Sequence, residues 1–327
     1  MRNAVDLGNV ITAMVTPFLG TGIIDLEDMG KLAQYLLNNG TDTLLLAGST
    51  GEASQLTPDQ KWMIIDHIRR VVPKDTKIMV AAGGRTTQEA ITNAKRAFEL
   101  GADAILMAVP EYDKPSQRAI NIYFSSVAKA IDGKPMMIYN IPGRTAREIY
   151  PQTVAELART NPNIIGIKQS MGDMDKVSKL KQLCPDDFQI YSGDDSLTLP
   201  MLALGAKGVV SVMSHLEGKK IQTMIRAFKN GFVSMAQAYH QTLYPLFSRV
   251  SMHDSQNGDD YANPLPIKEA LYQRGLIKSP RAHTLGEMSE YSKKEMRDVL
   301  ASVEKETKAL DQMWEKFPLS RANRNRT

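Results

Sequence analysis

Hydrophobic residues along the chain gather in short runs separated by longer amphipathic segments. Most of the short runs lack strict alternation, which is typical of parallel strands that are buried on both faces. Eight runs are predicted as strands: Val10–Phe18, Thr43–Gly48, Lys77–Gly83, Ala104–Pro110, Met136–Asn140, Ile164–Gln169, Gln189–Gly193 and Gly208–Met213. Between them, apolar positions recur at helical spacing and predict helices such as Leu26–Asn39, Pro58–Val72, Thr87–Leu100, Ser116–Ile131 and Pro151–Thr160.

Capping residues mark several ends of these helices. Thr57 before Pro58 predicts an N-cap followed by proline at the first helical position. Thr86 offers a hydroxyl cap with an acidic residue in the first turn. The glycines that separate a helix from the next strand are expected to adopt the left-handed C-cap conformation, and they are Gly40, Gly101 and Gly205.

Repeated strand–helix units over residues 1–231 favour a closed (β/α)8 barrel of the TIM type. An open doubly wound sheet is the alternative, but it needs a glycine-rich dinucleotide turn after its first strand, and residues 15–22 do not provide one. Residues 232–316 are predicted to form a helical region that covers a barrel face or builds a subunit contact. Its helices are expected at Ser234–Val250, Pro264–Arg274 and Met288–Lys316, with a polar loop at Met252–Ala262. Residues 317–327 form a basic tail that we expect to be disordered.

Composition excludes several classes of protein. The net charge is only +4 and aromatic residues make up 6% of the chain, which argues against a nucleic-acid binder. The single cysteine, Cys184, cannot form an intrachain disulfide or a cysteine-rich metal site. The first residues lack a signal-peptide pattern, and no apolar stretch approaches the roughly 20 residues that span a bilayer. We therefore expect a soluble, cytoplasmic protein.

The sequence gives no case for a metal site. The five histidines do not stand at ligand spacing with carboxylates. Asp194 and Asp195 are interpreted as part of a turn that caps the following helix. We expect no metal and no bound cofactor.

Lys168 stands out because it lies within an otherwise apolar strand of the predicted barrel. It could be a buried lysine paired with a carboxylate, or it could be a nucleophile. Burial in an apolar barrel disfavours the charged ammonium. A neutral amine can attack a ketone carbonyl and form an imine, which then acts as an electron sink.

Two further strand ends carry polar residues that could serve such an imine. Tyr139 ends the fifth strand, where its phenol is either a core aromatic or a proton relay. The turn Gly48-Ser49-Thr50-Gly51 either simply leads into a helix or forms a nest of N–H groups and hydroxyls suited to a carboxylate. Arg144, in the loop after Tyr139, could clamp a second acid group with its guanidinium.

Taken together, four motifs resemble those of the dihydrodipicolinate synthase/N-acetylneuraminate lyase family of class I Schiff-base aldolases. They are GSTGE at 48–52, YNIPGRT at 139–145, GIKQS at 166–170, and SGDD at 192–195 followed by LGAKGVVSV at 204–212. The resemblance runs from about Val10 to Gly275. It implies a lyase that carries pyruvate as an imine on Lys168 and needs no other cofactor.

The resemblance also implies roles for the other residues. Tyr139 shuttles protons, and Ser49 links it to a second tyrosine, Tyr112, which reaches into a neighbouring subunit's site. Thr50 joins Ser49 in holding the pyruvate carboxylate, between Gly48 and Gly51. Val210 offers a backbone carbonyl at the pocket floor. A homo-oligomer, arranged as a dimer of dimers and acting on small molecules, is therefore expected.

Subfamily signals do not agree. Arg144 and the SGDD motif resemble the synthase branch, which condenses pyruvate with aspartate semialdehyde in lysine and diaminopimelate biosynthesis. Ser49 and Gln169 resemble the lyases and sugar-acid aldolases, which release pyruvate from a 2-oxo sugar acid or N-acetylneuraminate. The synthase reaction is the first hypothesis, a pyruvate-forming aldolase, lyase or dehydratase the second, and a catalytically dead binding protein the third.

Feedback control by lysine is predicted to be absent. Lysine-inhibited members of the family carry His, Asn and Tyr ligands at positions that hold Pro58, Lys61, Arg85 and Glu111 here, and only Glu89 fits. Lysine is itself a cation, so Lys61 and Arg85 would repel it.

Overall fold

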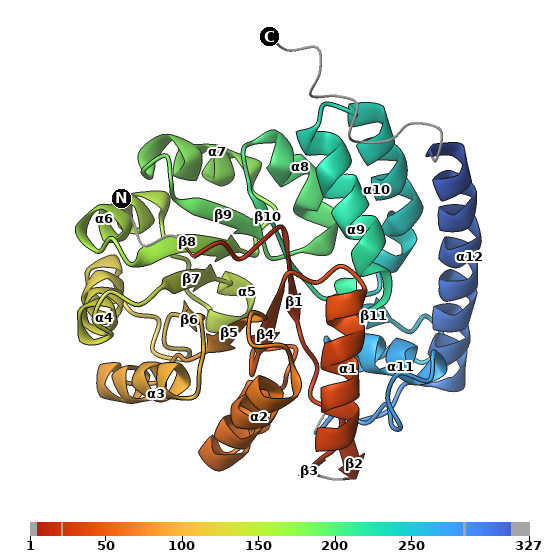
Figure 1. The fold of residues 1–327 in the computed structure, drawn as a ribbon, viewed down its shortest axis with the longest axis horizontal. Coiled ribbons are helices and arrows are strands. Elements are labelled where there is room, and N and C mark those ends of the chain that lie inside the picture. The colour runs from red at the N-terminus through yellow and green to blue at the C-terminus, as the bar shows by residue number, and fades with distance from the viewer. Residues whose placement is uncertain (1–4, 21, 284–285, 315–327) are drawn as a thin grey trace.

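A computed structural model describes residues 5–20, 22–283 and 286–314. Eight parallel strands close into a barrel in the order β1-β10-β9-β8-β7-β6-β5-β4, which confirms the predicted fold (Figure 1). The barrel strands are β1 (Val10–Ala13), β4 (Thr43–Leu46), β5 (Lys77–Ala81), β6 (Ala104–Ala108), β7 (Met136–Asn140), β8 (Ile164–Gln169), β9 (Gln189–Ser192) and β10 (Gly208–Ser211). The first and last strands pair directly, with Val10 opposite Val209, so this sheet has no free edge.

Helices surround the barrel on its outer side. They are α1 (Leu26–Asn38), α2 (Pro58–Val71), α3 (Thr87–Glu99), α4 (Gln117–Ala130), α6 (Pro151–Thr160), α7 (Met174–Leu183), α8 (Thr198–Ala203) and α9 (Ser214–Lys229), with a short α5 (Pro142–Thr145) after β7. Thr57 and Thr86 cap α2 and α3 as predicted, each accepting a backbone hydrogen bond. Gly40, Gly101 and Gly205 have φ values of 97°, 90° and 91°, which confirms their left-handed conformation.

Buried apolar side chains form two clusters. The smaller one fills the barrel interior and includes Ile11, Leu45, Met79, Tyr139 and Val210. The larger one lies between strands and helices and continues under the helices that follow the barrel. Those helices are α10 (Val233–Phe247), α11 (Leu265–Gln273) and α12 (Glu290–Trp314), which gather on one side of the barrel next to α9 (Figure 1).

Two small hairpins depart from the predicted elements. The first predicted strand ends at Ala13, and Phe18 instead begins the hairpin of β2 (Phe18–Gly20) and β3 (Ile23–Ile24). The polar loop predicted at 252–262 contains β11 (Met252–His253) and β12 (Asp260–Tyr261). The basic tail at 317–327 lies outside the described residues.

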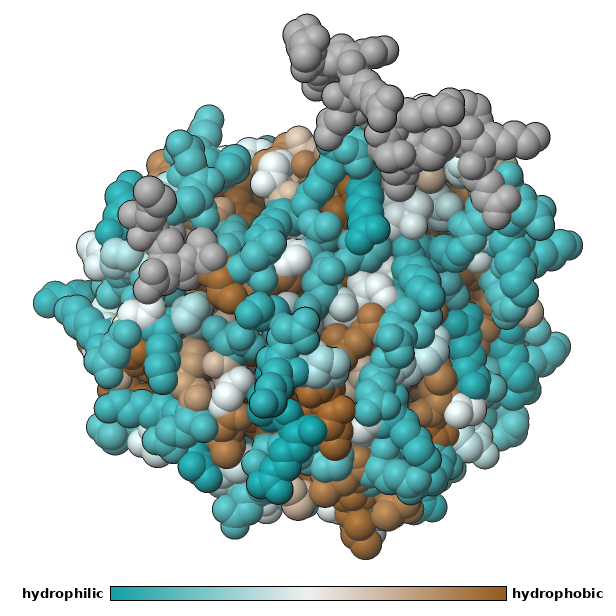
Figure 2. Space-filling model, in the orientation of Figure 1, coloured by the Kyte–Doolittle hydropathy of each residue, from teal (hydrophilic) through white to brown (hydrophobic). Residues whose placement is uncertain are grey.

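The molecular surface in view is mainly polar, with one apolar projection at its lower edge (Figure 2). Figure 1 places β2 and β3 there, and Leu19 and Ile23 of this hairpin are 58% and 61% exposed. Among the described residues, no helix is both long and apolar enough to cross a membrane.

Candidate active site

Lys168 points into the barrel because β8 carries a bulge. Met136 pairs with Ile164 but the next residue, Met137, pairs with Gly166, so Ile165 is an extra residue in the strand. Strict alternation from Ile165, which faces the interior, would turn Lys168 outward. The extra residue reverses the phase and brings Lys168 level with Tyr139.

Lys168 and Tyr139 are in direct contact at the carboxyl ends of β8 and β7. The Lys168 Nζ lies 4.2 Å from the centroid of the Tyr139 ring, and the two side chains are 6% and 9% exposed. The structure thus brings together the amine and the phenol that the sequence singled out, in a largely dehydrated site.

Gly193 leaves room for the lysine. A Cβ atom at this position would lie 3.1 Å from Lys168 Cε and 1.9 Å from Ser170 Oγ. The Ser170 hydroxyl is buried and has no hydrogen-bond partner among the described residues. Ser170 belongs to the GIKQS motif, but the sequence indicates no role for it, since only the fold brings it beside Gly193.

The aspartates after β9 lie near Lys168 but do not cap the next helix as expected. Asp195 is buried and accepts hydrogen bonds from the Ser211 hydroxyl and from the N–H groups of Val212 and Met213, at 3.0 and 3.1 Å. Burial raises the pKa of both Asp194 and Asp195, and the Lys168 charge opposes this rise. Asp195 therefore ties the end of β10 to β9. The predicted helix cap is wrong because the short Asp195 side chain bonds to the end of β10 instead of to the helix that follows it.

The GSTGE turn follows β4 at the same end of the barrel. Thr50 is buried, and its Oγ1 accepts a hydrogen bond of 3.0 Å from Asn263 Nδ2. The carbonyl of Asn263 in turn accepts a 3.3 Å hydrogen bond from Arg144 Nη2. Asn263 therefore connects Thr50 and Arg144, two residues that the sequence predicts for the site. Asn263 itself was not among the predicted site residues.

The turn is compact around its two glycines. Thr16 Oγ1 donates to the Gly51 carbonyl at 2.8 Å, and Ala53 N donates to the Gly48 carbonyl at 3.2 Å. A Cβ atom at Gly51 would come within 3.0 Å of the Met14 carbonyl oxygen, so little space is left for a side chain. Ser49 is partly exposed between them.

Val210 and Tyr112 have opposite surroundings. Val210 is fully buried in the barrel interior, where it pairs with Ile11 of β1. Tyr112 lies in the loop after β6, its side chain is 91% exposed, and its φ is 76°. This chain therefore does not enclose Tyr112 with the other predicted residues.

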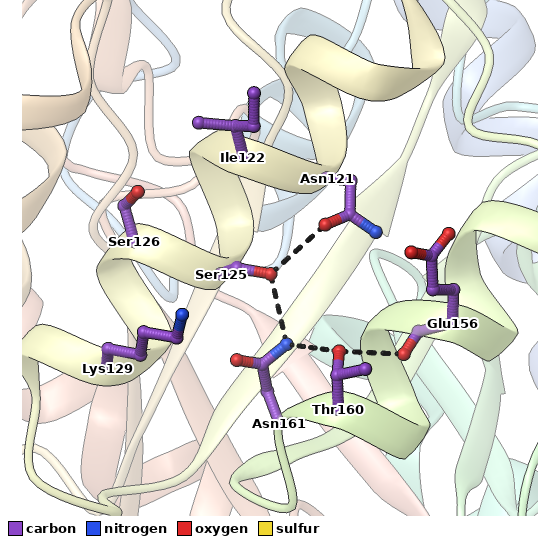
Figure 3. Close-up of a pocket in the computed structure, with 8 residues that line it drawn as sticks. All are labelled: Asn121, Ile122, Ser125, Ser126, Lys129, Glu156, Thr160 and Asn161. Atoms are coloured by element: carbon purple, nitrogen blue, oxygen red, sulfur yellow. Dashed lines mark hydrogen bonds between the residues drawn. The ribbon is translucent and has the colours of Figure 1, made fainter.

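A separate groove of about 370 Å³ opens on the outer wall between α4 and α6 (Figure 3). Its floor is held by Ser125 Oγ, which donates to Asn121 Oδ1 and accepts from Asn161 Nδ2, at 3.3 and 3.1 Å. None of the predicted site residues lines it. Over the described part of the chain, no three His, Cys, Asp or Glu side chains gather as a potential metal site.

Comparison with known proteins agrees with this barrel and its motifs. The model of the dihydrodipicolinate synthetase family matches residues 6–303. The chain belongs to this family.

Similar members are known by name and by structure. The 4-hydroxy-tetrahydrodipicolinate synthase of Nostoc punctiforme is 42% identical over 83% of this chain and 89% of its own. That of Thermosynechococcus vestitus is 44% identical over 84% and 90%. A solved structure of DHDPS from Cyanidioschyzon merolae with lysine bound has a TM-score of 0.86 and 36% identity, and covers 91% of this chain and 98% of that one. Family membership makes this chain a lyase of the class I aldolase type.

Proposed function

We propose that this protein is a 4-hydroxy-tetrahydrodipicolinate synthase, which condenses pyruvate with aspartate semialdehyde in lysine and diaminopimelate biosynthesis. The observation that carries the proposal is the buried Lys168 amine, 4.2 Å from the Tyr139 ring inside the barrel. Relatives that are 42% and 44% identical over most of the chain bear that name, which supports the same substrates here.

The chemistry starts from the Lys168 amine in a largely dehydrated site. Lys168 Nζ attacks the ketone carbon of pyruvate, and loss of water gives a protonated imine. This cation withdraws electrons from the methyl group, which gives up a proton and forms an enamine. The enamine carbon attacks the aldehyde carbon of the second substrate and makes the new C–C bond. The amino group of that substrate then displaces Lys168, which closes the ring and frees the enzyme.

The proposed residue roles match the chemistry of each group. Tyr139 donates and accepts the protons of imine formation, with Ser49 completing the relay. Thr50 and the N–H groups between Gly48 and Gly51 bind the pyruvate carboxylate. The Val210 carbonyl is proposed to lie at the pocket floor. Arg144 binds the carboxylate of the aldehyde substrate.

Tyr112 is proposed to serve the site of a neighbouring subunit. A tyrosine that is 91% exposed and held at a φ of 76° has no packing role in its own chain. A homo-oligomer built as a dimer of dimers would give it a partner site. We propose that the imine on Lys168 makes a bound cofactor unnecessary and that the enzyme acts in the cytoplasm.

A coupled assay tests the proposal. The purified protein is supplied with pyruvate, aspartate semialdehyde and the reductase that consumes the product, and we expect turnover that Lys168→Ala abolishes. Borohydride reduction with pyruvate should add one reduced pyruvate to the intact mass of the wild type and none to the variant. Absence of turnover with both substrates present would reject the synthase assignment.

One observation favours a second candidate, the release of pyruvate from a 2-oxo sugar acid. The unpartnered Ser170 hydroxyl beside Lys168 could bind a hydroxyl group of such a substrate. Lactate dehydrogenase detects pyruvate released from a panel of 2-oxo-3-deoxy sugar acids and N-acetylneuraminate. We expect little release, and turnover above that of the synthase reaction would favour this candidate.

A further inference from the structure

Glu52, the last residue of the GSTGE turn, forms a fully buried ion pair with Lys268 of α11. The two side chains are 1% and 0% exposed. Lys268 Nζ also donates to the Arg281 carbonyl at 2.8 Å and lies 4.3 Å from the centroid of the Phe18 ring. The other Glu52 oxygen accepts a 2.6 Å hydrogen bond from the backbone N–H of His283. Every polar atom of the pair therefore has a partner.

The backbone of Glu52 belongs to the turn that presents Ser49 and Thr50. Its φ and ψ are 58° and 34°, a left-handed conformation that is uncommon for a residue with a side chain. Its N–H donates to the Ser49 carbonyl at 3.1 Å. Such a conformation persists only where the surroundings hold it, and the buried carboxylate is the strongest anchor of this residue.

The segment at α11 holds the turn at a second point. Asn263, which precedes this helix, donates to Thr50 Oγ1 at 3.0 Å. Asn263 and Lys268 thus hold the two ends of the tripeptide Thr50-Gly51-Glu52 from outside the barrel.

We propose that Glu52 and Lys268 are a positioning pair that sets the placement of the carboxylate-binding turn against Lys168. This rests on the proposed function, in which Ser49 and Thr50 bind the pyruvate carboxylate. A ketone carbon reacts with an amine only from a near-attack geometry, and a displacement of about 1 Å can cost roughly 100-fold in rate. The pair acts on pyruvate alone, because the carboxylate of the aldehyde is assigned to Arg144.

A purely structural role for the pair is the competing explanation, and the variants are chosen to separate the two. Lys268→Met alone leaves an uncompensated buried carboxylate, which destabilises proteins strongly. The double variant Glu52→Gln/Lys268→Met removes both charges at similar volume, and such replacements often leave stability unchanged. Lys278→Met is the matched control, since Lys278 lies in the same C-terminal part but pairs with Asp25 and Glu27 of the α1 region, at 3.1 and 2.9 Å.

Kinetics and trapping on the intact enzyme provide the test. Each substrate is varied with the other saturating, and borohydride trapping is followed against pyruvate concentration, with thermal melts to establish folding. We expect the double variant to raise the KM for pyruvate by about 10- to 100-fold and to shift the trapping curve equally. The KM for aspartate semialdehyde should not change, and Lys278→Met should match the wild type in both.

Three results would overturn the inference in distinguishable ways. A folded double variant with the wild-type KM and trapping curve for pyruvate would refute the positioning role alone. A loss of activity that only follows the unfolded fraction seen in the melts, with both KM values and the trapping curve unchanged, would assign the pair to fold stability only. Failure of the wild type itself to be trapped would remove the proposed function and the positioning role together. If the double variant does not fold, the KM for pyruvate and the trapping curve are measured for Lys268→Met and Glu52→Gln instead. Wild-type values in a folded single variant would refute the positioning role.

Discussion

The direction of the Lys168 side chain depends on one residue, Gly166. The bulge in β8 places Gly166 opposite Met137 on one side and Gln189 on the other. A Cβ atom at Gly166 would lie 2.3 Å from the Gln189 carbonyl oxygen, so any side chain there must push β8 away from β9. The Lys168 amine therefore reaches the barrel interior because Gly166, two residues earlier in β8, has no side chain.

Gly166→Ala should consequently lower stability by about 1–3 kcal/mol, because a side chain is forced into a packed position. It should also reduce borohydride trapping of pyruvate by moving Lys168. Thermal melts and intact mass measure both effects. Gly172→Ala is the control, since nothing lies within 4 Å of an added Cβ atom there. A Gly166→Ala protein with unchanged melting and trapping would contradict this account of the bulge.

His215 is a second residue whose state is fixed by burial. It is fully buried, its Nε2 accepts a 3.2 Å hydrogen bond from Val15 N, and its Nδ1 lies 2.7 Å from the Val212 carbonyl oxygen. A carbonyl only accepts, so Nδ1 carries the hydrogen of a neutral ring. Burial lowers the pKa of His215 from 6.5 to about 4.

Stability should therefore fall with acid over a defined range. Above pH 6.5 the ring is neutral in both folded and unfolded chains, whereas between 6.5 and about 4 only the unfolded chain takes up a proton. Linkage gives a loss of roughly 3 kcal/mol across this range. Urea unfolding at both ends of the range should show a smaller loss in His215→Gln than in the wild type. Equal losses would show that His215 does not control acid stability.

At the scale of elements, the candidate site draws its residues from both the strands and the connections between them. The strands supply Lys168, Tyr139 and Val210, but Tyr112 and the turn proposed to bind the carboxylate lie in connections. The loop after β6 holds Tyr112 at a φ of 76° with 91% of its side chain exposed. Its conformation within one chain thus favours contact with another.

Tyr112→Phe should leave stability within about 0.5 kcal/mol of the wild type, because the hydroxyl is at the surface. Its kcat should fall about 100-fold, the usual contribution of a proton relay. Mixing this variant with inactive Lys168→Ala should restore activity, since a mixed dimer contains one site with an intact lysine and a partner tyrosine. The synthase assay measures this, and no recovery in verified mixed oligomers would place Tyr112 in its own subunit's site.

At the scale of the whole molecule, the helices after the barrel share its core. Met296, Leu300 and Val303 of α12 belong to the same apolar cluster as the outer faces of the strands. Asp311 of this helix pairs with Lys220 of α9 and accepts a 2.7 Å hydrogen bond from Tyr239 of α10. The domain boundary after residue 231 stays a prediction, and the shared core joins the two parts closely.

Regulation also belongs to this scale. Lys61 is partly buried, which lowers its pKa, and it is close enough to Glu89, Arg85 and Glu111 to feel their charges. A place where Lys61 already lies within electrostatic range of Glu89, and of a second cation, Arg85, should not bind cationic lysine. It would then differ from the DHDPS of Cyanidioschyzon merolae, whose structure has lysine bound. Assays across a lysine titration should show no inhibition. Inhibition at sub-millimolar lysine would contradict this prediction.

The sequence by itself determined the barrel, its caps and the set of candidate reactive residues. Hydrophobic runs, glycine C-caps and motif residues are local features, so Lys168, Tyr139 and the 48–52 turn could be found without coordinates. It did not reveal the hairpin at Phe18, because a strand pattern continues past Ala13 while the chain turns.

Only the tertiary structure decided which residues meet. The inward direction of Lys168 depends on the pairing of β8 with β7. The position of the Ser170 hydroxyl beside Gly193 depends on the packing of β8 against β9. The Glu52–Lys268 pair depends on the placement of α11. These contacts join segments up to 216 residues apart. Contacts between segments so far apart form only when the free energy of the whole fold outweighs the entropy lost in closing the loop. No local pattern of residues therefore predicts them.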